Sequence, residues 1–137
     1  MTQYESMFYL SSCPVSSFEK AQAAVEELIC LDVLIEAVPE RERLYREIVR
    51  IIADAFMRSP ERPVIIDGEE IRFGYLQEIY RELEPENISD VADALERYPR
   101  EIRYKKAFLR TALFNARLEA ETGVTNLFSV NKWKAEQ

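Results

Sequence analysis

Six prolines separate the periodic apolar stretches of this 137-residue chain, and glycine occurs only three times. Proline and glycine are the residues that interrupt helices most strongly. The stretches between them are rich in Glu, Arg, Ala and Leu, which favour helix, and nearly half of the chain is apolar. A chain of this size and composition can bury a substantial core. We therefore predict a mostly α fold, a compact bundle of about six helices.

The periodicity of the apolar residues predicts where these helices lie. Apolar positions that recur every three or four residues mark one side of an amphipathic helix. The clearest helix in the first half runs from Glu40 to about Arg58, with alternating acids and bases on its polar side. Further helices are predicted over Phe18–Leu31, Val33–Ala37, Phe73–Leu83, a segment containing Ile88 to Leu95, and Glu101–Thr122. Their expected caps are Ser16 or Ser17, Asp32, Asn87 or Ser89, and Gly123.

One short segment has the pattern of strands. Val64 to Ile71 reads VIIDGEEI, and an Asp-Gly pair tolerates the positive φ angles of a type I′ turn. The segment therefore predicts a small β-hairpin, which must pack on the helices because an isolated hairpin is marginally stable.

The chain is expected to form a single helical domain over residues 1–137, with an N-terminal arm at 1–15 and a C-terminal tail at 124–137. No linker or internal repeat divides it. Leu109 and Leu113 form the apolar stripe of the last long helix. We expect them to be buried against Ile48, Ile52 and Leu95.

Composition argues against several classes of protein. The chain has no histidine and two cysteines, which removes the usual catalytic base and the common zinc ligand sets. No phosphate-binding glycine loop is present. We expect no enzymatic activity, no cofactor and no bound metal. No apolar run reaches the roughly 18 residues of a membrane span, and no signal peptide is evident, so we expect a cytoplasmic protein with reduced thiols.

The positive charge of the chain is concentrated in one region. Residues 97–117 carry seven bases and one acid, whereas the rest of the chain carries 11 bases and 24 acids. On the predicted helix, Arg103, Lys106 and Arg110 recur at three and four residues and share one side. Two interpretations stay open: a surface that binds DNA backbone or an acidic protein, or a solvated surface paired with nearby acids. The candidate binding residues are Arg100, Arg103, Lys105, Lys106 and Arg110.

The same region resembles a known family. The sequence IRYKKAFLRTALFNA, from Ile102 to Ala116, is similar to a signature near the C-terminus of plasmid and mobile-element replication initiators of the replication initiator protein A type, from Firmicutes. The similarity extends back to about Val25 through DVLIEAVPERERLYREIVRIIADAF and VIIDGEEI. The family carries a proline soon after the final Asn-Ala. Arg117-Leu118-Glu119 follow here instead, so the helix is expected to continue.

This resemblance implies a DnaD-like helical domain, the non-catalytic C-terminal domain of a replication initiator. Such a domain would recruit replication machinery, a primase or a helicase loader, at an origin. DNA contact would be weak or indirect, and a homo-oligomer is left open. Two alternatives remain: a regulatory protein-interaction module unrelated to replication, and a small DNA-binding protein that uses the basic helix 101–122.

Overall fold

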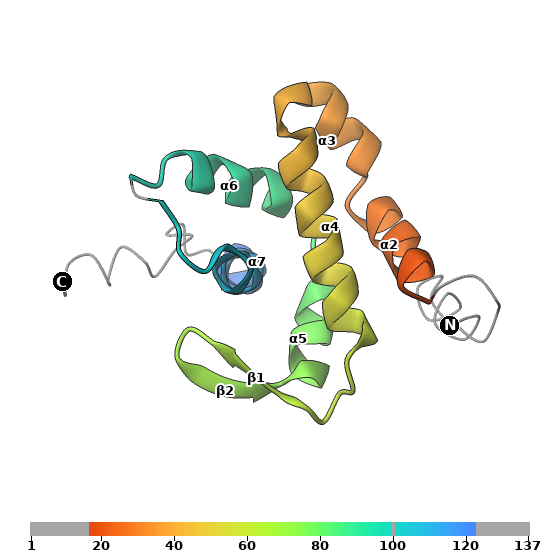
Figure 1. Ribbon diagram of the computed structural model, residues 1–137, viewed down its shortest axis with the longest axis vertical. Helices are drawn as coiled ribbons and strands as arrows, with labels where there is room; N and C mark the ends of the chain where they lie inside the picture. The colour runs from red at the N-terminus through yellow and green to blue at the C-terminus, as the bar shows by residue number, and fades with distance from the viewer. Residues whose placement is uncertain (1–16, 100, 123–137) are drawn as a thin grey trace.

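A computed structural model describes residues 17–99 and 101–122, and Figure 1 shows their arrangement. They form six α-helices, one 3-10 turn and one antiparallel hairpin. The prediction of a mostly α bundle with a small hairpin is confirmed. The predicted arm and tail, and the caps at Ser16 and Gly123, lie outside the described residues. The elements are α2 (Ser17–Leu28), α3 (Leu31–Ala37), η2 (Pro39–Arg41), α4 (Glu42–Met57), β1 (Pro63–Ile66), β2 (Glu69–Arg72), α5 (Phe73–Tyr80), α6 (Pro85–Glu96) and α7 (Lys105–Thr122).

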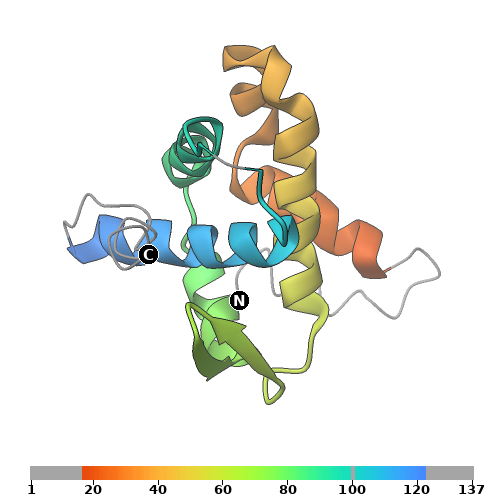
Figure 2. The same cartoon turned by 60° about the vertical axis from the view of Figure 1, so that its left-hand side comes forward.

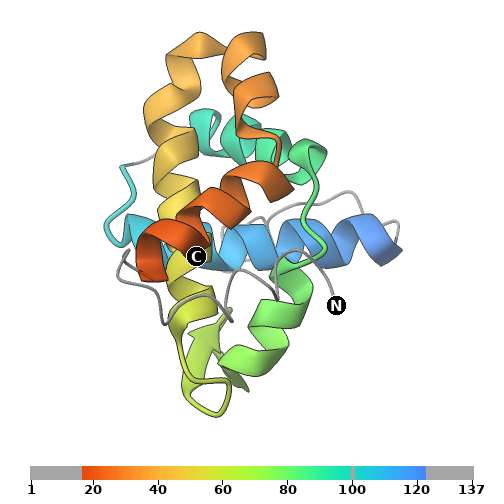
Figure 3. The same ribbon diagram turned by 90° about the vertical axis from the view of Figure 1, so that its right-hand side faces the viewer.

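Helix α4 is the centre of the bundle. It contacts α2, α3, α5, α6 and α7, and α2 and α7 lie on opposite sides of it (Figures 1 and 3). Half of its residues are buried, including three in a row from Ile51 to Ala53. A surface helix buries a single apolar stripe. Helix α4 buries more than one stripe, because neighbouring helices cover several of its sides. The buried residues are Tyr45, Ile48, Val49, Ile51, Ile52, Ala53, Ala55 and Phe56.

The hairpin forms where the Asp-Gly pair predicts it. Asp67 and Gly68 have φ angles of 55° and 82°, the two positive values that a type I′ turn requires. The register pairs Ile66 with Glu69 across the turn. Val64 and Ile66 are buried while Ile65 is exposed, so the inner side of β1 joins the core.

The break between α2 and α3 falls earlier than predicted. Helix α2 ends at Leu28 rather than Leu31, because Cys30 adopts a left-handed conformation with φ 54°. Helix α3 then starts at Leu31, and Asp32 lies in its first turn instead of capping it. The expected cap at Asp32 is therefore wrong, although a carboxylate in the first turn still favours the positive end of a helix.

Helix α6 also starts earlier than predicted. Its N-cap is Glu84, and Pro85 occupies the first helical position, where a missing N–H costs nothing. The backbone N–H of Glu84 donates to Oδ1 of Asn87 at 2.9 Å, which completes a capping box. The predicted caps Asn87 and Ser89 are wrong, since Asn87 acts from the third position of the helix.

A buried glutamine joins α5 to the end of α4. Nε2 of Gln77 donates to the carbonyls of Ala55 and Arg58, both at 2.9 Å. The last carbonyls of a helix have no partner within the helix. Gln77 is only 6% exposed. Its buried amide therefore supplies hydrogen bonds to the Ala55 and Arg58 carbonyls in place of water.

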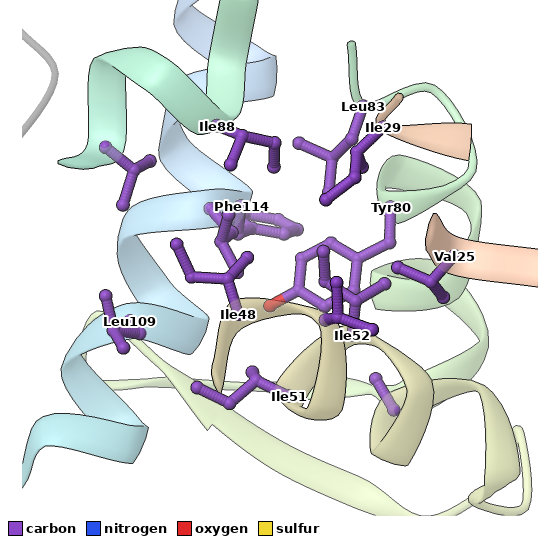
Figure 4. Packing of buried hydrophobic residues seen from close by; sticks show 14 of the residues in the cluster. Val25, Ile29, Ile48, Ile51, Ile52, Tyr80, Leu83, Ile88, Leu109 and Phe114 are labelled. Atoms are coloured by element: carbon purple, nitrogen blue, oxygen red, sulfur yellow. The ribbon is translucent and has the colours of Figure 1, made fainter. Parts of the chain in front are cut away.

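Helix α7 packs on α4, α5 and α6. Leu109, Leu113, Ile48 and Ile52 are all fully buried in one cluster, and Leu95 lies partly buried against it. The predicted burial of the α7 stripe is confirmed, and Figure 4 shows Leu109 and Phe114 on α7 facing Ile48 on α4. The fully buried Tyr80 hydroxyl donates to the Arg110 carbonyl at 2.7 Å, and burial raises the pKa of Tyr80.

Leu113→Ala should lower the free energy of unfolding by about 2–5 kcal/mol, because the substitution removes buried methyl groups and leaves a cavity. Urea unfolding followed by circular dichroism measures the loss. Lys106→Ala, an exposed position on the same helix, is the control and should change stability by less than about 0.5 kcal/mol. Equal losses in both variants would show that the inner side of α7 is not where the structure puts it.

Candidate functional site

The basic helix begins later than the sequence indicates. Helix α7 starts at Lys105 rather than Glu101, and Arg103 and Tyr104 lie in a turn before it. The first helical hydrogen bond runs from the N–H of Phe108 to the carbonyl of Tyr104 at 2.9 Å. The segment between α6 and α7 has to turn the chain (Figure 2), and apolar spacing carries no information about that turn. The predicted helix 101–122 is corrected to 105–122.

The five candidate residues do not form one continuous surface. Arg100 lies outside the described residues. Arg103, Lys105 and Lys106 are exposed, while Arg110 is half-buried. Nζ of Lys105 lies 3.1 Å from Oε1 of Glu47 on α4, so the charge of Lys105 is paired.

The Arg110 side chain is half-buried and lies over an aromatic ring of α5. Its guanidinium lies 5.9 Å from the centre of the Phe73 ring at the start of α5, and its Nε is buried without a hydrogen-bond partner in the structure. Arg117, the last base of the region, lies 3.5 Å from Glu82 and 3.6 Å from Glu84. The basic region is therefore divided between paired, half-buried and exposed cations.

An exposed cluster remains, formed by Arg103, Tyr104 and Lys106, which we call the basic corner. Tyr104 is 72% exposed, and the Arg103 guanidinium lies 5.8 Å from the centre of its ring. Within residues 17–99 and 101–122, no carboxylate forms an ion pair with Arg103 or Lys106. An exposed aromatic ring among unpaired cations suits a partner that offers negative charge and some apolar surface.

A buried arginine that no sequence pattern reveals lies in η2, just before α4. Arg41 is 8% exposed, and it donates to both carboxylate oxygens of Glu96, at 2.8 and 2.7 Å. It also donates to Asp93 on α6 and to the hydroxyl of Tyr45, the latter at 3.2 Å. No local pattern distinguishes Arg41 from the other arginines of the segment, since its partners lie more than 50 residues away.

The charge of Arg41 is paired with two carboxylates of α6. The hydrogen bond to Glu96 raises the pKa of Arg41 against the opposing effect of burial, and the same bond lowers the pKa of Glu96. Nearby, burial raises the pKa of Asp90, and the charges of Glu86 and Asp93 add to that rise. Arg41 of η2 binds the carboxylates of Asp93 and Glu96 on α6. This cluster therefore holds η2 against α6, and we call it the clamp.

The described residues also show whether a metal-binding cluster or a membrane-spanning helix is present among them. Within them, no three histidine, cysteine, aspartate or glutamate side chains are grouped so that they could hold a metal ion. Among the helices described, none has the length and apolar character needed to cross a membrane.

Comparison with protein-family models, with curated proteins and with solved structures finds no match to this chain.

Arg41→Met should destabilise the fold by about 1–3 kcal/mol, because the charged hydrogen bonds to α6 are lost. The effect should depend on pH. Since the pKa of Glu96 is lowered in the folded state, its contribution is present above the usual glutamate pKa of about 4.3 and is lost as pH falls below it. Urea unfolding at neutral pH and near pH 3 measures both. If the variant and the wild type differ in free energy of unfolding by the same amount at both pH values, the clamp is contradicted.

Proposed function

We propose that this chain is a non-catalytic adaptor domain of a plasmid or transposon replication initiator, which binds a primase or a helicase loader at an origin. The observation that carries the proposal is the basic corner, an exposed aromatic ring beside two cations that form no ion pair with any carboxylate of the described residues. The resemblance of Ile102–Ala116 to replication initiators supplies the biological setting.

The segment Ile102–Ala116 has a buried part and an exposed part, and this division supports the proposed adaptor function. Its apolar positions are structural, because Leu109, Ala112, Leu113, Phe114 and Ala116 are buried. Its basic spacer, from Arg103 to Lys106, is exposed. One stretch of sequence thus fixes α7 in the core and presents the start of that helix to solvent, which is what a rigid docking surface needs.

Electrostatics favours an acidic protein surface as the partner rather than duplex DNA. The chain carries a net charge of −7, which repels a polyanion at long range. Screening limits such repulsion to about 8 Å at physiological ionic strength, so a local contact can still form. Non-specific duplex binding needs several phosphates neutralised at once, and the basic corner offers only two unpaired cations.

Replacing Arg103 and Lys106 with alanine should abolish binding of a purified Firmicutes primase or helicase loader to this chain. Both side chains are exposed, so the melting temperature should change little. Biolayer interferometry with each purified protein at about 0.15 M salt measures binding directly.

The matched control is Arg62→Ala with Arg72→Ala. Arg62 precedes β1, Arg72 is the last residue of β2, and both are exposed. This variant therefore has the same net charge as the test variant. Loss of binding in the test variant alone supports the proposal. Wild-type binding by the test variant, or no binding by the wild-type chain to either protein, would overturn it.

Binding to duplex DNA should be detectable only at low salt and should fall steeply as salt rises, because each phosphate contact contributes a slope of about −0.9 to the logarithmic salt dependence. Fluorescence anisotropy with labelled origin duplex measures it. Tight, sequence-specific binding at about 0.15 M salt would instead support a DNA-binding protein that uses α7.

A further inference from the structure

Helix α3 presents a surface that complements the basic corner. Asp32, Val33 and Glu36 are exposed, and their spacing of three and four residues places them together on one side of the helix. We call them the acidic face of α3. Val33 is 63% exposed. It is an apolar side chain flanked by two acids, and helix α3 contains no base.

Tyr104 and Val33 are the two most exposed of the large apolar side chains in the described residues, followed by Ile65 at 59%. In the sequence Tyr104 lies next to Arg103 and Lys105, and Val33 lies next to Asp32 and one helical turn before Glu36. Ile65 has a mixed setting, because its cross-strand partner is Glu70 and the same strand carries Arg72. The acidic face of α3 thus combines an exposed apolar side chain with charge opposite to that of the basic corner.

We propose that two copies of this chain associate by docking the basic corner of one copy on the acidic face of α3 in the other. Tyr104 would contact Val33, while Arg103 and Lys106 would pair with Asp32 and Glu36. The occupant is a second copy because the chain itself carries both halves of a complementary contact. The inference does not rest on the proposed function, since no replication protein takes part.

The two surfaces lie at different places on one molecule. The ion pair between Lys105 and Glu47 holds the start of α7 beside α4, whereas α3 lies at the end of the bundle where α4 begins (Figure 2). Each copy therefore offers one surface of each kind. Two copies related by a twofold axis would form two identical contacts and leave neither surface free. If each pair formed only one contact, the free surfaces at its ends could bind further copies.

The association has a functional consequence within the adaptor proposal. A second copy would cover the same basic corner that a primase or helicase loader would use. Self-association and partner binding would then exclude each other, and the partner would dissociate the assembly.

Charge reversal tests the contact directly. The first variant carries Arg103→Glu and Lys106→Glu, and the second carries Asp32→Lys and Glu36→Lys. Sedimentation velocity at about 0.1 M salt should show concentration-dependent association for the wild-type chain, and monomers for each variant alone. An equimolar mixture of the two variants should associate again, because each reversed surface then meets its opposite. Arg62→Glu with Arg72→Glu is the control, since it changes net charge as much as the first variant and should still associate.

Salt supplies a second measurement. Association of the wild-type chain should weaken at about 1 M salt, because the Debye length there is only about 3 Å and exposed charges are strongly screened. A wild-type chain that stays monomeric at every concentration would overturn the proposal. So would two variants that remain monomeric when mixed, with circular dichroism showing that both are folded. Association by the first variant alone would also overturn it, because the basic corner would not be needed.

Discussion

The position of α4 is the constraint on which the rest of this structure depends, and polar side chains hold it at both ends. At its start, Arg41 ties the preceding turn to Asp93 and Glu96 on α6. At its end, Gln77 of α5 donates to the carbonyls of Ala55 and Arg58. A buried polar group stabilises a fold only when it is satisfied, so these bonds specify where α5 and α6 lie relative to α4. The apolar core then fills the space that they define.

The docking of α7 on this frame explains why one stretch of sequence has two roles. Its inner residues meet α4, α5 and α6, and the hydroxyl of Tyr80 fixes its second turn by donating to the Arg110 carbonyl. The start of the helix is held separately by the ion pair from Lys105 to Glu47. Because the helix is anchored at two points, the exposed side chains of the basic corner sit on a rigid support. The packing residues of α7 therefore also fix where the polar residues between them are displayed.

The local sequence pattern predicts those elements that depend mainly on interactions between residues close in the chain. Periodicity located the long helices, and the Asp67-Gly68 pair located the hairpin with its turn type. The start of α7 was missed because the turn before it depends on how α6 and α7 meet. The break at Cys30 was missed because a left-handed residue other than glycine has no reliable signal in a single sequence. For the candidate site, residue type identified Arg103 and Lys106, but only the packing showed that Lys105 and Arg117 are paired and that Arg110 lies over Phe73. Arg41 could not be found at all, since its partners are distant in sequence.

The bond from Gln77 to the end of α4 has a consequence for how this protein opens. It closes a loop that contains the hairpin, and the N–H groups of Phe73 and Gly74 strengthen the closure by donating to the carbonyls of Arg62 and Pro60, both at 2.9 Å. Breaking the glutamine contact would expose carbonyls of α4 and loosen α5 and the hairpin together. The last turn of α4, the hairpin and α5 should therefore behave as one cooperative unit in native-state hydrogen exchange. Their amide protons would share a single opening free energy, although they belong to a helix end, a sheet and a second helix.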